Sequence, residues 1–159
     1  MLEPKDIYDI LDSENISYEV ILHEAIYTID NNADFKNKEK CVKNLFLRDD
    51  KKRNYYLLVV EPTKSVNLKK LQVLIHSRRL SFANENDLYD YLGLIKGSVT
   101  PLGILNNVDK NVELIFDTDI NGIVGVHPLV NDASVFLEVE DLKSLIRKYD
   151  YKIKEIKIP

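Results

Sequence analysis

The residues best placed to do chemistry stand at the start of an apolar run. Lys43 and Asn44 precede that run, and a polar turn over residues 49–54 leads into a second apolar run over residues 55–60. Two short apolar runs joined by six polar residues predict a hairpin. The first run is apolar on both faces, which is typical of a strand inside a sheet that is covered on both sides. A cation and an amide at the end of a buried strand are well placed to meet a ligand.

A second candidate is a loop of glycine, proline and small residues, Gly97-Ser98-Val99-Thr100-Pro101. This composition favours a tight, rigid turn with free backbone N–H groups, which can hold an anion or clamp a flat ligand, although most such loops have no such role. His127 ends a glycine-flanked β-branched run, and Pro128 biases it towards extended backbone. A lone histidine is more often a structural hydrogen-bonding residue than a catalyst, but its place at a strand end favours a role in a pocket.

Several kinds of site are excluded by what the sequence lacks. No GxGxxG, Walker, GxSxG or HExxH motif occurs, and His23, His76 and His127 have no metal-ligand spacing with Cys41 or with one another. The single cysteine excludes an internal disulfide, suits a reducing cytosol, and is better explained as a buried thiol than as a nucleophile. We therefore expect no metal and no cofactor, so any hydrolysis must depend on positioning, electrostatics or groups of the substrate.

The bulk properties favour one globular domain over residues 1–159. The chain is 45% hydrophobic and 30% charged, and no apolar run approaches the ~20 residues that span a bilayer. The acidic N-terminus is unlike a secretory signal, so we expect a cytoplasmic protein with no membrane partner. The net charge of −4 argues against sequence-blind binding to nucleic acid, yet thirteen basic residues outnumber four acidic ones between Lys36 and Arg79. This segment is either an ordinary solvated surface or a footprint for a polyanion.

The elements that must position these residues alternate irregularly. Periodicity and capping residues predict helices over residues 4–14, 67–75, 84–91 and 141–149, with a short helix from Thr28 or Asp30 to about Lys38. Strands are predicted over residues 18–22, 43–48, 55–60, 79–83, 104–105, 112–116, 123–126, 133–138 and 152–158, with 104–105 and 112–116 forming a second hairpin. No sustained βαβ repeat occurs. We expect an α/β (α+β-like) fold with a mixed, mostly antiparallel sheet, curled or forming a partial barrel and flanked by helices.

Four stretches occur together in one order: an HxxxxT-like stretch at His23–Thr28, Lys43-Asn44-Leu45-Phe46-Leu47-Arg48-Asp49, the Gly97-x-x-x-Pro101 loop and Gly125-Val126-His127-Pro128. In this order and at these distances they resemble the YbaK / prolyl-tRNA-synthetase-associated domain family, above all its freestanding ProX (PrdX) branch. Each stretch alone is a weak signal, whereas the combination is specific and covers nearly the whole chain. The resemblance implies a YbaK-like fold and an aminoacyl-tRNA deacylase that acts in trans.

The activity implied is removal of alanine that was wrongly attached to proline tRNA. A synthetase pocket built for proline cannot refuse a smaller amino acid, because lost methylenes discriminate by only ~1–3 kcal/mol each. The resemblance implies Lys43 as the key catalytic residue, with help from the 2′-hydroxyl of the terminal adenosine. The residues that it implies in the substrate pocket are Asn44, Gly97, Ser98, Val99, Thr100, Pro101 and His127.

The resemblance also gives the basic segment a use, as a contact for the acceptor end of proline tRNA, with prolyl-tRNA synthetase as a second partner. The residues predicted to contact RNA are Lys36, Lys38, Lys40, Lys51, Lys52, Arg53, Lys64, Lys69 and Lys70. Three alternatives stay open: a deacylase for cysteine on proline tRNA, a non-catalytic module that binds tRNA ends or the synthetase, and a small-molecule sensor.

Overall fold

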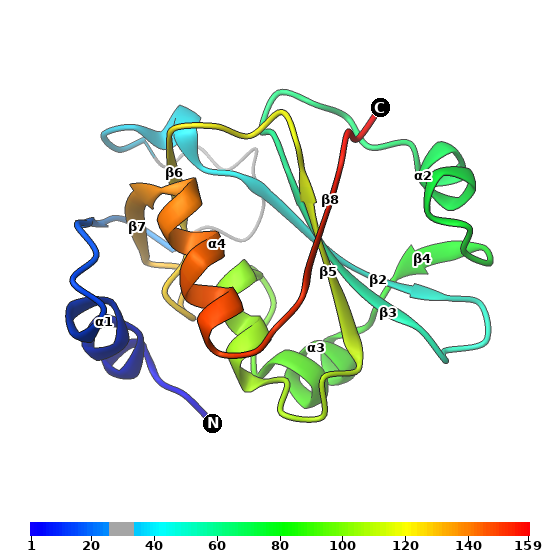
Figure 1. The fold of residues 1–159 in the computed structure, drawn as a ribbon, viewed down its shortest axis with the longest axis horizontal. Helices are drawn as coiled ribbons and strands as arrows, with labels where there is room; N and C mark the ends of the chain where they lie inside the picture. Colours follow the sequence, from blue (N-terminus) through cyan, green and yellow to red (C-terminus); the bar gives the residue numbers. More distant parts are fainter. Residues whose placement is uncertain (26–33) are drawn as a thin grey trace.

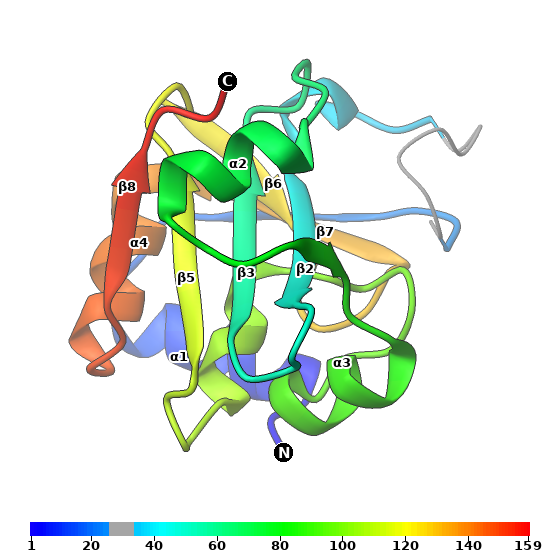
Figure 2. The same ribbon diagram turned by 90° about the vertical axis from the view of Figure 1, so that its right-hand side faces the viewer.

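The computed structural model describes residues 1–25 and 34–159, and the strands of this part form two sheets (Figures 1 and 2). The larger sheet consists of β2 (Lys43–Asp49), β3 (Tyr55–Val60), β4 (Leu80–Phe82), β5 (Val112–Asp117) and β8 (Ile153–Ile156), in the order β4-β2-β3-β5-β8. The smaller sheet consists of β1 (Glu19–Leu22), β6 (Ile123–Val126) and β7 (Ala133–Glu138), in the order β1-β7-β6. The helices of the described part are α1 (Pro4–Ser13), α2 (Leu68–Ile75), α3 (Glu85–Leu92) and α4 (Val139–Lys148), with 3-10 helices η1 (Lys38–Lys40) and η2 (Pro101–Asn106).

The predicted hairpin of β2 and β3 is confirmed, with Lys43 opposite Val60. Its turn is held by Asp49, which is buried and whose carboxylate accepts the backbone N–H of Arg53 at 2.9 Å and the side-chain N–H of Asn54 at 2.8 Å. Burial alone would raise the pKa of Asp49, but these hydrogen bonds outweigh it and lower that pKa. A buried side chain therefore fixes the turn, and with it the register of β2.

Both faces of the hairpin are covered, as its apolar composition predicted. On one face Phe46 and Leu57 belong to a large core that also takes in α1, α3 and α4. On the other face Leu47 and Leu58 belong to a smaller core under α2. Figure 1 shows α2 and α4 on opposite sides of the larger sheet. Because side chains alternate along a strand, Lys43 lies on the α2 face of β2, and Asn44 lies on the opposite face.

The predicted second hairpin is wrong. Ile104 and Leu105 lie in η2 and not in a strand, and β5 instead pairs in parallel with β3 and β8. Pro101 begins the 3-10 helix, and the hydroxyl of Thr100 accepts the N–H of Leu102 at 3.3 Å. Two adjacent apolar residues have no periodicity of their own, so the capping residues before them decide the local structure.

Most of the other expectations for the fold agree with the structure. The fold class is confirmed: helices flank a mixed arrangement in which most strand pairs are antiparallel, although the two sheets do not close into a barrel. Asn67 and Asn84 cap α2 and α3 as predicted. The helix expected from Thr28 or Asp30 falls largely outside the described residues, but residues 34–37 are described and are not helical, so that part of the prediction is wrong; Lys38 begins the 3-10 helix η1. Among the described residues no helix has the length and apolar character to cross a bilayer.

The two sheets meet at a parallel bridge between Cys41, just before β2, and Gly125 of β6. The N–H of Val42 donates to the carbonyl of Gly125 at 3.2 Å. We call this junction the sheet seam. Gly125 has no room for a side chain, because a Cβ there would lie 2.7 Å from Cys41 Sγ and 2.7 Å from Cε1 of Phe136. The two segments run in the same direction. Lys43 therefore lies two residues after Cys41, and His127 lies two residues after Gly125.

We predict that Gly125→Ala lowers the free energy of unfolding by about 1–3 kcal/mol, because overpacking of a buried site typically costs that much. Thermal and denaturant unfolding would measure the loss. The double variant Cys41→Ala with Gly125→Ala removes the sulfur contact and should regain part of it. An unchanged unfolding midpoint in Gly125→Ala would show that the seam is packed more loosely than described.

Candidate functional site

Lys43 stands at the first residue of β2, half-buried, and its ammonium donates to the backbone carbonyl of Lys64 in the connection from β3 to α2. A lysine ammonium has three N–H donors. One hydrogen bond to a carbonyl therefore directs the side chain and leaves donors for a ligand. A carbonyl is neutral, so it does not cancel the positive charge of Lys43.

The Lys64 carbonyl is itself held in place by the side chain of the same residue. Lys64 Nζ donates to Asp117 at 3.0 Å, to Asp119 at 2.7 Å and to the backbone carbonyl of Ile158 at 2.8 Å. Burial alone would lower the pKa of Lys64, but the two carboxylates outweigh it and raise that pKa. Three hydrogen bonds use all three N–H donors of this ammonium. Lys64 was predicted to contact RNA, and in this structure it has no donor left for a phosphate.

Asn44 presents an unusual polar atom on the other face of β2. Its side-chain N–H donates to the carbonyl of Val42 at 3.3 Å, while its side-chain oxygen is buried and has no hydrogen-bond partner among the described residues. A buried acceptor without a donor costs about 1–3 kcal/mol. An incoming N–H donor, such as the α-ammonium of an amino acid, would remove that cost.

His127 lies just after β6, on the opposite side of the seam from Lys43. Its Nδ1 is 2.9 Å from the backbone carbonyl of Ala133, and because a carbonyl only accepts, Nδ1 carries the proton. Burial lowers the pKa of His127, and the opposing effect of the bond to Ala133 is smaller. The ring is therefore neutral at pH 7, with Nε2 as an acceptor.

A hydrogen-bonded chain behind the seam went unnoticed in the sequence. Ser134 is buried, and its hydroxyl lies 2.8 Å from His23 Nε2, while His23 Nδ1 lies 2.7 Å from the carbonyl of Glu24. Cys41 also bonds to Ser134, and burial raises the pKa of its thiol to about 11. Such a thiol is a poor nucleophile at neutral pH. Cys41 is half-buried, whereas its interpretation as a buried thiol implies full burial. Thr28, the end of the HxxxxT-like stretch, lies outside the described residues.

The Gly97–Pro101 loop makes a tight turn, and Gly97 has a φ of +86°, in the left-handed region that favours glycine. Ser98 is buried; its hydroxyl donates to the carbonyl of Ile95 at 2.7 Å and accepts the N–H of Ile95 at 3.2 Å. Thr100 caps η2. The hydroxyls thus stabilise the loop itself, as does the N–H of Ser98, which donates to the carbonyl of Ile95 at 3.1 Å. The N–H groups of Gly97, Val99 and Thr100 are the part of the loop that could meet a ligand.

The loop and the seam share one apolar core. Val99 packs against the large core, which contains Leu102 from the loop side together with Val42 and Val126 from the seam. The bridge thus places the backbones of Lys43 and His127 near each other, whereas the Lys43 side chain lies on the α2 face of β2 and the loop packs against the large core on the opposite face. The hydrogen bonds of the loop residues described above reach only Ile95 and Leu102, which are neighbours of the loop in the sequence.

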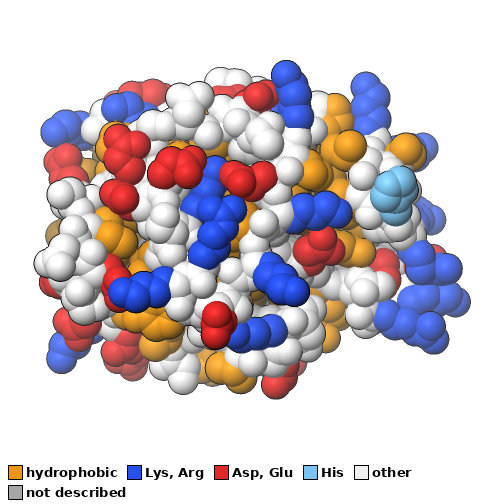
Figure 3. Space-filling view, viewed as in Figure 1, with side chains coloured by type: hydrophobic (Ala, Val, Ile, Leu, Met, Phe, Trp, Pro, Cys, Tyr) orange, Lys and Arg blue, Asp and Glu red, His pale blue; other side chains and the backbone are white. Residues whose placement is uncertain are grey.

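The predicted RNA-contacting residues fall into three groups at different places. One group flanks η1 close to Lys43, one lies exposed at the start of α2, and one lies at the far end of the hairpin. In the same order they are Lys36, Lys38 and Lys40; Lys69 and Lys70; and Lys51, Lys52 and Arg53. Because β2 has seven residues, the hairpin turn is about 20 Å from Lys43. Figure 3 shows basic side chains gathered at the right-hand edge, where Figure 1 places that turn.

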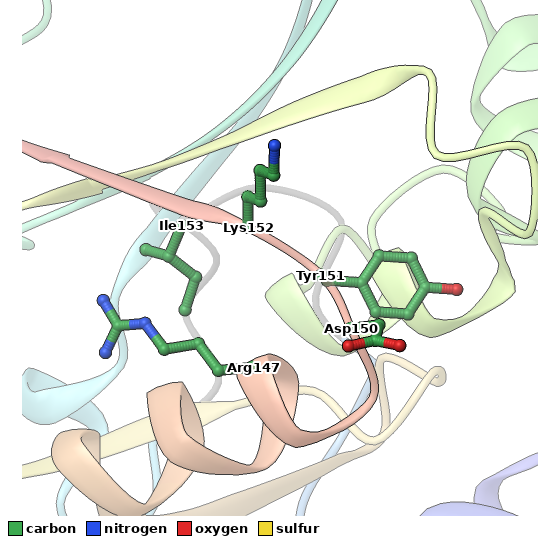
Figure 4. Close-up of a pocket in the computed structure, with 5 residues that line it drawn as sticks. All are labelled: Arg147, Asp150, Tyr151, Lys152 and Ile153. Carbon is green, nitrogen blue, oxygen red and sulfur yellow. The ribbon is translucent and has the colours of Figure 1, made fainter.

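Two surface depressions lie away from the seam. One follows α4 and is lined by Arg147, Asp150, Tyr151, Lys152 and Ile153 (Figure 4). The other begins beside it and extends to the start of β3 and β5. None of the predicted site residues lines either depression. In the described part of the chain, no group of three or more His, Cys, Asp and Glu side chains is arranged to hold a metal ion.

Comparisons with known proteins find relatives of this chain. Residues 23–145 match the family model of the aminoacyl-tRNA editing domain. Prolyl-tRNA editing protein ProX of Acetoanaerobium sticklandii is 42% identical over 152 residues, which is 93% of each chain. Prolyl-tRNA synthetase associated domain-containing protein 1 of Mus musculus is 31% identical over 140 residues, which covers 83% of this chain and 82% of that protein. The crystal structure of a proposed trans-editing enzyme for prolyl tRNA synthetase matches with a TM-score of 0.67 at 17% identity, over 100% of both chains, and shows the same fold.

We predict that the ring of His127 titrates below the ordinary histidine pKa of about 6.5, because burial disfavours its charged form. Below about pH 6.5 the unfolded chain binds a proton at His127 more readily than the folded chain does. The free energy of unfolding therefore decreases as the pH falls through this range. A histidine ring titration by NMR would measure the pKa. His127→Gln should reduce the pH dependence of unfolding in that range, and an ordinary pKa in the folded protein would contradict the assignment.

Proposed function

The chain belongs to the aminoacyl-tRNA editing domain family, and from this premise we propose that it is a trans-editing deacylase that removes alanine from wrongly charged proline tRNA. The relative from Acetoanaerobium sticklandii is a prolyl-tRNA editing protein, which supports proline tRNA as the substrate. The observation that carries the proposal is the seam, where Lys43 and Asn44 begin β2 and His127 follows β6, each just after the bridge.

The proposed reaction is hydrolysis of the ester between alanine and the terminal ribose. Water adds to the acyl carbon, the bond to the ribose oxygen breaks, and one water proton ends on that oxygen, which gives free alanine and uncharged tRNA. The resemblance to the family implies that the ribose 2′-hydroxyl assists, which suits a site whose only cysteine is held as a thiol of raised pKa. Positioning and charge stabilisation must supply most of the remaining rate acceleration.

Each residue of the site has a proposed role. The Lys43 ammonium binds the acyl carbonyl or a phosphate oxygen, and the unpartnered oxygen of Asn44 accepts from the α-ammonium. These two side chains leave β2 on opposite faces, so a substrate at the end of the strand can meet both. Neutral His127 shapes the pocket, and backbone N–H groups of the Gly97–Pro101 loop steady the developing oxyanion.

Alanine is proposed as the group removed because a synthetase pocket built for proline cannot refuse a smaller amino acid. The enzyme must leave proline itself attached. Cysteine is only slightly larger than alanine, so the rates of release of these two amino acids must be compared directly.

We expect the protein to release alanine from proline tRNA faster than cysteine, and to leave proline attached. Ester loss from tRNA charged with each of the three amino acids would measure this. Lys43→Ala should slow alanine release by about a hundredfold, as loss of one donor to an oxyanion typically does. Lys154→Ala is the matched control, because Lys154 is an exposed lysine on β8 paired with Glu113 at 3.6 Å. A wild-type rate in Lys43→Ala would refute the role of this lysine.

We also propose that the basic groups near the seam contact the acceptor stem, and that affinity therefore falls steeply with salt. Lys40 is three residues from Lys43, whereas Lys52 lies in the distant turn of the hairpin. Lys40→Ala should weaken binding more than Lys52→Ala and reduce the salt slope by about 1. Binding curves between ~50 and ~200 mM salt would measure both effects. An affinity indifferent to salt would contradict the proposed contact.

A further inference from the structure

We propose that Lys64 and Asp117 are positioning residues, whose buried ion pair fixes the backbone carbonyl that directs the Lys43 ammonium. This inference rests on the proposed function, because it assigns the pair a part in that reaction. Lys64 links the ion pair to the site directly, because its side chain pairs with Asp117 and its backbone carbonyl accepts from Lys43.

Asp117 ties together three segments that are distant in the sequence. Its carboxylate is fully buried and accepts the backbone N–H groups of Glu61 at 3.1 Å, Asp119 at 3.1 Å and Ile158 at 3.3 Å, in addition to the Lys64 ammonium. Figure 1 shows the C-terminal end beside the connection from β3 to α2. The Lys64 carbonyl therefore belongs to a connection that is anchored to the end of β5 and to the C-terminal segment.

The ion pair holds the Lys64 backbone in place, whereas the charge of Lys43 is left for binding. A free lysine side chain samples many rotamers, so an ammonium without a partner spends only part of its time in a productive position. A carboxylate partner would hold it but would also cancel its charge. Here Asp117 and Asp119 neutralise Lys64, and Lys43 receives only a neutral carbonyl. Lys43 is thus held with its charge available for a substrate oxygen.

The chain provides a matched control for a purely structural role. Lys143 is another buried lysine, with Nζ 2.6 Å from Glu155 and 3.3 Å from Glu140, and its ammonium lies over the ring of Phe116. Its described contacts lie on α4, β5 and β8, and none of them is with Lys43. Loss of either buried lysine leaves carboxylates without their partner, so both variants should lose stability.

The test compares Lys64→Met with Lys143→Met in deacylation of alanine-charged proline tRNA, at a temperature at which both variants are folded. We expect Lys64→Met to lower kcat at least about tenfold with KM within about twofold, the pattern of an interaction made only in the transition state. Lys143→Met should keep kcat within about twofold. Lys64→Arg keeps a cation between the carboxylates and should recover part of kcat. Equal losses in both methionine variants, or a wild-type kcat in Lys64→Met, would overturn the proposal.

A milder variant covers the case in which Lys64→Met does not fold. Asp117→Asn removes the charge that pairs with Lys64 and keeps a side-chain oxygen that can accept the backbone N–H groups of Glu61, Asp119 and Ile158. This variant should fold with an unchanged circular dichroism spectrum and show a lower kcat at an unchanged KM. An unchanged kcat would overturn the proposal.

A measurement without RNA separates this inference from the proposed function. The ammonium signal of Lys43 can be assigned by NMR of 15N-labelled protein through its loss in Lys43→Arg. We expect Lys64→Met to shift and broaden that signal, and Lys143→Met to leave it unchanged. A Lys43 signal unaffected by Lys64→Met would overturn the positioning role. A wild-type protein that releases no amino acid would defeat the proposed function, and the NMR comparison would still decide the positioning.

Discussion

The parallel bridge between Cys41 and Gly125 sets how the two sheets of this protein meet, and the candidate site is arranged around it. The bridge requires a residue without a side chain on β6, because sulfur and aromatic carbon fill the space where a Cβ would lie. The two bridged segments run in the same direction, so the residues that follow the bridge on each segment start from the same place. Lys43 and His127 each lie two residues beyond that point. Their proximity is thus a consequence of backbone geometry rather than of a contact between the two side chains.

The ionisable groups around this junction are of three kinds, which differ in their charge and in their partners. Lys64 and Lys143 are buried against carboxylates and serve as structural cations. His127 and Cys41 are held neutral by burial, which lowers the pKa of the first and raises that of the second. Of these three lysines, Lys43 is the one whose described partner is a neutral carbonyl and no carboxylate. In a half-buried site, a cation without a counterion is the group that an anionic oxygen of a substrate would neutralise.

The sequence predicted those parts of the fold that depend on neighbouring residues. The hairpin from Lys43 to Val60 follows from two apolar runs and a polar turn, and the caps at Asn67 and Asn84 follow from single side chains that accept local N–H groups. The strand predicted at Ile104 was wrong, because a pair of apolar residues is equally compatible with a strand and with a 3-10 helix. The roles of Lys43, Asn44 and His127 stay predictions, although the strand that presents the first two was foreseen.

Interactions between distant residues could not be read from the sequence in this way. Ser134 meets His23 across 111 positions, and Lys64 meets Asp117 across 53, so only the folded sheets bring these groups together. Composition marked Lys64 as one basic residue among many in its segment. Its burial between carboxylates separates it from the exposed lysines nearby, and that distinction exists only in three dimensions.

The central claim is that the seam holds the aminoacyl end of a charged tRNA around the start of β2. A crystal structure with a non-hydrolysable alanyl-adenosine amide tests it most directly. The account predicts a carbonyl or phosphate oxygen of the analogue about 3 Å from Lys43 Nζ and its α-ammonium within hydrogen-bonding distance of the Asn44 side-chain oxygen. An analogue bound instead in the depression beside α4, with the seam unchanged and Asn44 still without a donor, would contradict it.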